Sequence, residues 1–243
     1  KGLVLHNNIY KMSVKDVATL YEYWTYLKLG QILGRKYELV SQDIIKVSRD
    51  GLYVNLEANK KAERVYKHPV TNEKITLTYQ KHEGNLPTVT QKPDTMLSIG
   101  KKGESYSFNY VFDAKYRIDF AAADSYYGNK YQTPGPMEDD INTMHRYRDS
   151  IVAEYDGPYE RKAFGAYVLF PWNEEHNYQE HRFYKSIDKV NIGGLPFLPN
   201  ATGLIERFIE NLIDKSPEQL QRDGILPRGS LQKWKESIEE KVF

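Results

Sequence analysis

The segment from residue 108 to residue 119 constrains the fold of this chain most, because apolar and polar side chains alternate along it. Successive side chains of a β-strand point to opposite faces, so this pattern predicts a strand with one apolar face. Residues 94–99 predict a preceding strand, and the turn formers at 100–103 predict a hairpin. The apolar face comprises Phe108, Tyr110, Phe112, Ala114, Tyr116 and Ile118. The opposite face comprises Asn109, Val111, Asp113, Lys115, Arg117 and Asp119.

Three charged side chains stand at the ends of these predicted strands. Asp94 follows Pro93 and opens the first strand, while Asp113 and Lys115 share one face of the second strand. Burying an unpaired charge costs on the order of several kcal/mol, so a chain rarely places such residues there for stability. Pairing as a hairpin would bring Asp94 and Asp113 together, and carboxylates beside an amine suit a divalent metal ion and a phosphate. The alternative is an exposed strand end with a Lys–Asp surface pair.

A helix is predicted near the start of the chain, over residues 13–34. Ser13 is a suitable N-cap, and Gly34 is a suitable residue to end the helix. Glu22 lies within this helix and is either a solvated surface residue or a third member of the acidic cluster. Apolar residues at helical spacing predict the buried face, which comprises Val17, Leu20, Tyr21, Trp24 and Leu27.

Together, Pro93-Asp94 and Asp113-Ala114-Lys115 resemble the signature of the PD-(D/E)xK nuclease superfamily. Residues 21–24, with the sequence YEYW, resemble the YE-x-W helix of its DUF2357/DUF524-type branch. That branch is related to the nuclease subunit of McrBC-type modification-dependent restriction systems. The resemblance covers residues 13 to about 172 and implies an α/β restriction-endonuclease-like core, with a mixed central β-sheet flanked by helices.

The resemblance also implies an active site and a cofactor. Asp94 and Asp113 would bind Mg²⁺, or Mn²⁺ in its place, with Glu22 as a third acid and the Ala114 carbonyl as a further ligand. Lys115 would position or activate the attacking water. The implied function is a metal-dependent DNA endonuclease, the cleavage domain of an McrBC-like restriction system. Two alternatives remain open: a nuclease-like module that docks a partner NTPase, and a nuclease of DNA repair or transposition.

A second helix is predicted behind the strand at 108–119. Residues 140–149, DINTMHRYRD, resemble a DxNxMHxYRD helix of the same branch. The resemblance implies that His145, Tyr147 or Arg148 supports the site or contacts DNA, whereas the alternative is a core-packing helix with surface charges. Pro136 is well placed for the first helical turn, and the acidic residues after it favour the positive helix N-terminus. The predicted buried stripe comprises Ile141, Met144, Arg148, Ile151 and Val152.

The other segments complete a single predicted domain, residues 1–243, with a core of about 13–172 and a C-terminal helical extension of about 200–243. A hairpin over residues 62–82 is a candidate insertion or arm. Residues 121–135 predict an irregular loop, which is either a flap over the substrate or a plain surface loop. Further strands are predicted at 36–47, 51–56, 165–172 and 190–192, a turn at 193–194, and further helices at 202–212 and 231–242.

Composition and charge limit the partners of this chain. The 34 basic and 33 acidic residues give a net charge of +1, which is less basic than a stand-alone DNA-binding protein usually is. We therefore expect that the chain acts on a DNA substrate. Its affinity for DNA would come from a local part of its surface, from an McrB-like AAA+ NTPase subunit or from other domains of a longer chain. The sequence has no cysteine, which excludes disulfides and thiolate metal sites and agrees with a cytoplasmic protein. No apolar run is long enough for a membrane span.

Overall fold

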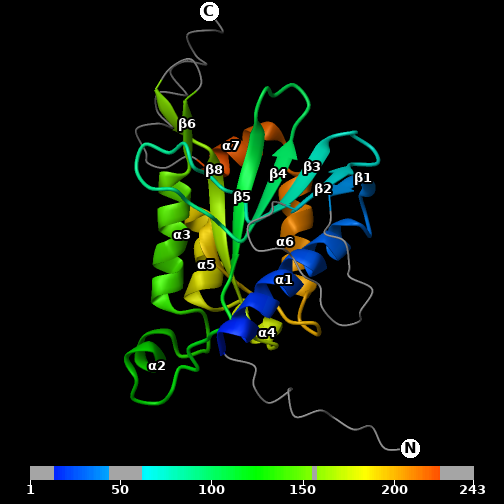
Figure 1. Ribbon diagram of the computed structural model, residues 1–243. Coiled ribbons are helices and arrows are strands. Elements are labelled where there is room, and N and C mark those ends of the chain that lie inside the picture. The colour runs from blue at the N-terminus through cyan, green and yellow to red at the C-terminus, as the bar shows by residue number, and fades with distance from the viewer. Residues whose placement is uncertain (1–13, 44–61, 155–157, 225–243) are drawn as a thin grey trace, which may run out of the picture.

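A seven-stranded mixed sheet forms the centre of the molecule, with the strands in the order β1-β2-β3-β4-β5-β8-β9 (Figure 1). The structure is a computed structural model, and it describes residues 14–43, 62–154 and 158–224. Strands β1 to β5 pair antiparallel, whereas β8 is parallel to both β5 and β9. The sheet strands are β1 (Glu38–Asp43), β2 (Ala62–Lys67), β3 (Lys74–Tyr79), β4 (Thr95–Gly100), β5 (Ser107–Ala114), β8 (Ala163–Phe170) and β9 (Ile192–Pro196).

Helices flank this sheet, which confirms the predicted α/β fold class. Figure 1 shows α3 running alongside β8 and α1 crossing the sheet obliquely. A separate two-stranded ribbon consists of β6 (Val152–Glu154) and β7 (Tyr159–Arg161). Within the described ranges, no helix combines the length and the apolar character that crossing a membrane requires. The helices are α1 (Val14–Leu33), α2 (Tyr126–Tyr131), α3 (Glu138–Ser150), α4 (Glu175–Tyr178), α5 (Arg182–Val190), α6 (Gly203–Asp214) and α7 (Pro217–Gly224).

Two apolar clusters pack against the sheet. The larger one joins α1 and α6 to strand residues such as Tyr79 and Phe112. The smaller one lies under α3 and contains Val111 and Met144. Because Val111 and Phe112 are neighbours in β5, the two clusters lie on opposite faces of the sheet. Strand β5 is therefore buried on both faces, and the polar face predicted for residues 108–119 is covered along this strand.

The strand predicted over residues 108–119 ends earlier than expected, because β5 leaves the sheet after Ala114. The backbone N–H of Lys115 still donates to the Leu169 carbonyl of β8 at 2.8 Å. The backbone N–H of Arg117 then donates to the Lys115 carbonyl at 2.8 Å, which turns the chain away from the sheet. Tyr116 is consequently 46% exposed instead of belonging to an apolar strand face. Lys115 thus lies where the central strands end.

The predicted hairpin at residues 62–82 forms as β2 and β3, with Asn72 in the left-handed region at a φ of 61° in its turn. This hairpin does not project as an arm. Strand β2 pairs with β1 and β3 pairs with β4, so the hairpin extends the central sheet. Strand β1 falls within the predicted segment 36–47, whereas the elements predicted at 51–56 and 231–242 lie outside the described residues.

Helix α1 confirms the predicted N-terminal helix, and Gly34 follows its last residue. The proposed cap, Ser13, lies outside the described residues. The buried face is rotated from the predicted stripe, since Leu20 is 46% exposed whereas Tyr26 is fully buried. Tyr26 packs against Tyr79 of β3, with ring centroids 5.3 Å apart. This packing fixes α1 across the antiparallel half of the sheet.

Helix α3 confirms the predicted second helix, with two corrections at its ends. Its N-cap is Met137, so Pro136 precedes the first turn instead of lying in it. Val152 belongs to β6 and not to the helix. Asp140 and Tyr147 are buried in addition to the predicted stripe. These two unpredicted burials place polar groups of α3 against the end of β5.

Two further local predictions are corrected. Residues 121–135 contain α2, and backbone hydrogen bonds between Asp119 and Gly135 close this segment at its base. The pair at 193–194 lies in β9, where a Cβ on Gly193 would stand 2.1 Å from the Phe183 carbonyl oxygen of α5. Helices α5 and α7 and the β6–β7 ribbon were not predicted, whereas the helix predicted at 202–212 is confirmed as α6.

His181 attaches α2 to α5. Its side chain is 2% exposed, Nδ1 accepts a 3.0 Å hydrogen bond from the Phe183 N–H, and Nε2 lies 3.3 Å from the Tyr127 hydroxyl of α2. The ring also stacks against Tyr131 and Tyr178. Burial lowers the pKa of His181 to about 4. The imidazole is therefore neutral at physiological pH and belongs to an aromatic cluster beneath α3.

The neutral His181 ring should make stability depend on pH. Its pKa is about 4 in the folded chain against an ordinary value of 6.5, so between these values the unfolded chain binds more protons. The stabilisation is fully present above about pH 6.5 and is lost as the pH falls toward about 4. Urea unfolding at about pH 7 and about pH 4.5 should show a smaller loss on acidification in His181→Phe than in the wild type. An equal loss in both proteins would contradict this assignment.

Candidate active site

Strands β4 and β5 bring two acidic side chains to the same end of the sheet. Thr95 lies opposite Phe112 in the antiparallel register, so Asp94 and Asp113 meet just beyond this pair. Asp94 Oδ2 accepts a 2.8 Å hydrogen bond from the backbone N–H of Ala114. Asp113 is 1% exposed. The structure therefore brings together the two acids that the hairpin predicted as neighbours.

Lys115 contacts both carboxylates. Its Nζ lies 2.5 Å from Asp113 Oδ2 and 3.9 Å from Asp94 Oδ2. Burial lowers the pKa of Lys115, but the attraction of Asp113 and Asp94 outweighs burial, and the pKa lies above its ordinary value. Lys115 is therefore an ammonium at neutral pH, and it balances part of the negative charge gathered at this end of the sheet.

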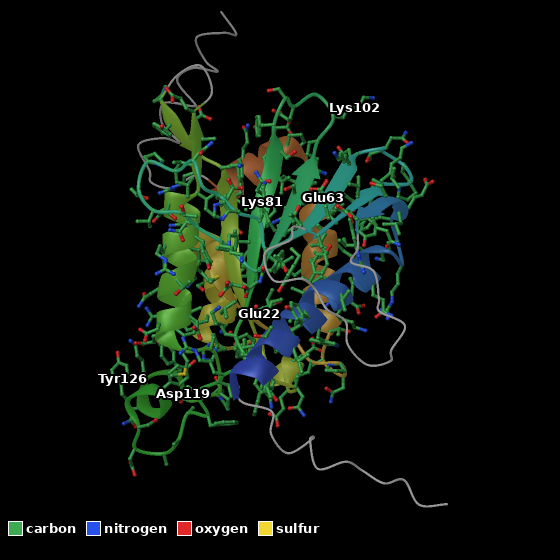
Figure 2. The ribbon with its side chains drawn as sticks, viewed as in Figure 1. Glu22, Glu63, Lys81, Lys102, Asp119 and Tyr126 are labelled. Atoms are coloured by element: carbon green, nitrogen blue, oxygen red, sulfur yellow. The ribbon has the colours of Figure 1, made fainter. Side chains whose placement is uncertain are left out.

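Glu22 of α1 lies within electrostatic range of the same cluster. Figure 2 shows Glu22 on the stretch of α1 that crosses the sheet near its lower end. Burial raises the pKa of Glu22, Lys115 lowers it, Asp113 raises it and Lys92 lowers it, and the net shift is upward. These interactions mean that Glu22 shares the electrostatic environment of Asp113 and Lys115. Glu22 is half-buried, in keeping with a place at the edge of this cluster.

Burial and neighbouring carboxylates act together on Asp94. Burial raises the pKa of Asp94 well above its usual range, and Asp113 and Glu22 raise it further. Lys115 and the backbone N–H of Ala114 lower it without reversing the shift. Neighbouring carboxylates resist simultaneous ionisation unless a positive charge joins them. The cluster is thus short of positive charge, which favours binding of a cation.

The donor atoms fit a hard divalent cation, which prefers carboxylate and carbonyl oxygens. Asp113 Oδ2 is buried and, among the described residues, receives no hydrogen bond of normal geometry; its close neighbour is the Lys115 ammonium. In the same part of the chain, no group of three or more acidic or histidine side chains lies close enough together to hold a metal ion. Two acids, Asp94 and Asp113, share the Lys115 ammonium, and a metal ion bound to them would take over part of the charge that Lys115 balances.

Of the three candidate side chains on α3, one reaches the acids. The Tyr147 hydroxyl donates to Asp113 Oδ1 at 3.3 Å. Arg148 instead donates from Nη1 to the Val190 carbonyl at 2.7 Å, which ties α3 to the end of α5. His145 is exposed. The geometry thus brings Tyr147 to the cluster, gives Arg148 a packing contact and leaves His145 on the surface.

The sequence pattern of one protein family, described as the PD-(D/E)XK nuclease superfamily, matches residues 19–175. The chain belongs to the PD-(D/E)XK nuclease superfamily. The matched stretch runs from α1 to the start of α4 and contains Glu22, Asp94, Asp113 and Lys115. No curated protein and no solved structure matches the chain. Members of this superfamily generally use divalent metal ions, in keeping with the oxygen donors at this site.

The ion pair between Arg117 and Asp140, near the acids, was not predicted from the sequence of this nuclease. Asp140, in the first turn of α3, has a side chain that is 1% exposed, and it accepts hydrogen bonds from Arg117 Nε at 3.1 Å and from Arg117 Nη2. An acidic residue in a first helical turn already has a local explanation in the helix dipole, so its residue type did not indicate an ion-pair partner. The signal that could have found it is the arginine two residues after Lys115.

Tyr147→Phe should lower the cleavage rate of the nuclease about ten-fold, because it removes a hydrogen bond that orients a buried carboxylate. Steady-state cleavage at saturating Mg²⁺ measures the effect, and thermal unfolding checks that the fold is unchanged. Tyr159→Phe is the matched control, since Tyr159 is 56% exposed on β7. Equal rates for the two variants would reduce Tyr147 to a packing residue.

Proposed function

We propose that this nuclease is a metal-dependent DNA endonuclease that hydrolyses phosphodiester bonds. The observation that carries the proposal is the convergence of Asp94 and Asp113 on the Lys115 ammonium, with Glu22 beside them. Phosphodiester hydrolysis needs positive charge at the phosphate and a positioned water, and a carboxylate pair with an adjacent amine can supply both.

Each side chain has a distinct role in this proposal. Asp94 and Asp113 would hold Mg²⁺ or Mn²⁺ with the Ala114 carbonyl, and Glu22 would be the third acid. When bound, the ion stabilises charge on the phosphate and lowers the pKa of a water molecule. Lys115 donates hydrogen bonds to phosphate oxygens and orients the attacking water, because its raised pKa keeps it protonated. Tyr147 fixes the orientation of the Asp113 carboxylate.

We further propose that the chain belongs to the McrBC-like branch and serves modification-dependent restriction in the cytoplasm, as an antiviral defence. Support comes from the YEYW segment, whose half-buried Glu22 lies within electrostatic range of Asp113 and Lys115. The net charge of +1 supports a division of labour in which a second component supplies most of the DNA affinity. That component would be an McrB-like AAA+ NTPase subunit or other domains of a longer chain.

One observation favours a second candidate function. The Lys115 ammonium lies 2.5 Å from Asp113 and 3.9 Å from Asp94, so it balances part of their negative charge. A nuclease fold that docks a partner NTPase and no longer cuts would keep this ion pair as a structural contact. A nuclease of DNA repair or transposition would have the same site as the main proposal, and it would differ in its DNA substrate.

A cleavage assay separates these functions. The purified chain is incubated with modified and unmodified plasmid DNA in Mg²⁺, in Mn²⁺ and in EDTA, with and without an McrB-like NTPase and nucleotide. Cleavage that requires the metal supports the endonuclease, and preference for modified DNA supports the restriction branch. Cleavage of both DNAs alike would favour repair or transposition. Absence of cleavage, together with no Mg²⁺ or Mn²⁺ binding in calorimetry, would assign the docking function.

A further inference from the structure

Arg117 combines a fixed position with an exposed guanidinium. Two of its donors, on Nε and Nη2, bind the Asp140 carboxylate. The Asp140 side chain is 1% exposed, whereas the Arg117 side chain is 54% exposed. The pair therefore consists of a buried carboxylate in the first turn of α3 and a cation that reaches solvent. A guanidinium has five N–H donors in a planar fork, so donors remain on the edge that Asp140 does not occupy.

A tight turn connects this guanidinium with the acid cluster. The Arg117 N–H donates to the Lys115 carbonyl at 2.8 Å, so both residues leave the end of β5 within one turn. The hydrogen bond with Asp140 raises the pKa of Arg117, burial lowers it, and the charges of Asp140, Asp139 and Asp113 raise it. The interaction with Asp113 means that the guanidinium lies within electrostatic reach of the acids. Arg117 is thus the cation that follows Lys115 along the chain and flanks the same site.

We propose that Arg117 binds a phosphate of the DNA strand adjacent to the phosphate that is cut, and that Asp140 positions the guanidinium for this contact. Planar, bidentate recognition of phosphate oxygens is what an arginine fork provides and a lysine does not. Because Asp140 already immobilises the side chain, binding costs little further side-chain entropy. The proposal rests on the nuclease function proposed above and adds a substrate contact to it. The competing explanation is that the pair only fastens the segment after Lys115 to α3.

DNA binding by a variant that cannot cut separates the two explanations. In an Asp113→Asn background, fluorescence anisotropy measures the Kd of a labelled duplex over a range of salt concentrations, beginning at low salt. Arg117→Ala should weaken binding about ten-fold and reduce the slope of log Kd against log salt by about one. Arg117→Lys should keep the slope and recover only part of the affinity. Arg35→Ala is the matched control, because Arg35 is also 54% exposed and pairs with Glu206 of α6.

Two further variants guard against loss of the fold. Arg117→Ala alone leaves the buried Asp140 carboxylate without its cation, which can destabilise the protein. The double variant Arg117→Ala/Asp140→Asn removes both charges, and it should bind DNA as weakly as Arg117→Ala while unfolding near the parent temperature. The single variant Asp140→Asn keeps the Arg117 guanidinium but removes the carboxylate charge that holds it in position. It should weaken binding less than Arg117→Ala and keep the salt slope.

The outcomes distinguish this contact from the nuclease function itself. If the Asp113→Asn parent binds DNA and the Arg117 variants match Arg35→Ala in both affinity and slope, the ion pair is only a fastening and the proposed contact is wrong. If the parent has no affinity at low salt and the wild type also fails to cut DNA, the nuclease function fails and the contact falls with it.

Discussion

Asp113→Asn should abolish DNA cleavage, with a loss of about a thousand-fold or more in rate. Asparagine keeps the size of the side chain but removes the negative charge that meets Lys115 at 2.5 Å and that would hold the metal ion. It also replaces the carboxylate that accepts a hydrogen bond from the Tyr147 hydroxyl. Because the amide still fills the buried position, the protein should fold. Mg²⁺-dependent plasmid cleavage and thermal unfolding of the purified variant measure both expectations.

Asp149→Asn is the matched control for this variant. It removes the same charge from a residue of α3 whose side chain is 50% exposed and pairs with Arg161. Its cleavage rate should equal that of the wild type. Wild-type cleavage by pure Asp113→Asn would remove Asp113 from the active site and overturn the proposed metal site with it.

Lys115→Met should have the second largest effect, a loss of about a hundred-fold or more in the cleavage rate. Methionine fills similar space but offers the phosphate no positive charge. The variant also leaves Asp94, Asp113 and Glu22 without their shared cation, so the free energy of unfolding should fall by up to about 3 kcal/mol. Added Mg²⁺ should raise the unfolding temperature of the variant more than that of the wild type, since the ion then binds without displacing an ammonium.

Lys130→Met controls for the loss of a paired lysine. The Lys130 side chain is 34% exposed, close to the 30% of Lys115. Its Nζ lies 2.8 Å from Glu138 Oε1. It should leave cleavage unchanged. Equal Mg²⁺ effects on the unfolding temperatures of Lys115→Met and the wild type would show that the ammonium and the ion do not share a site. Full activity of Lys115→Met would contradict its proposed contact with phosphate.

The sequence predicted the central hairpin because its signals are local. Alternation along residues 108–112 and a glycine-rich turn are sufficient to specify β4 and β5. The end of β5 was not predictable, because the alternation continues to Ile118 while the chain turns away after Ala114. The last hydrogen bond of this edge to the sheet, from the Lys115 N–H, goes to the Leu169 carbonyl of β8, a strand far along the sequence. The buried face of α1 was misjudged for a similar reason, since packing against Tyr79 decides it.

In the candidate site too, contacts within the hairpin were predictable, whereas contacts between distant elements were not. Asp94 approaches Asp113 because β4 and β5 pair as a hairpin, and the short spacing between the two motifs in the sequence indicates this hairpin. The side chain that α3 presents to the acids could not be chosen from sequence. Tyr147 and Arg148 are neighbours that point about 100° apart on a helix, and only the packed orientation selects Tyr147. Asp140 stayed unrecognised because its partner lies on another element.

Strand β5, which carries Asp113, lies between β4 and β8 in the sheet. Its partner β8 begins only at Ala163, long after the acids and the amine in the order of synthesis. Parallel pairing between distant segments forms late, because a long loop must first close. A chain still emerging from the ribosome therefore has Asp94, Asp113 and Lys115 but lacks the strand that flanks β5 on its second edge. If the proposed nuclease function holds, DNA can be cut only after translation has passed β8.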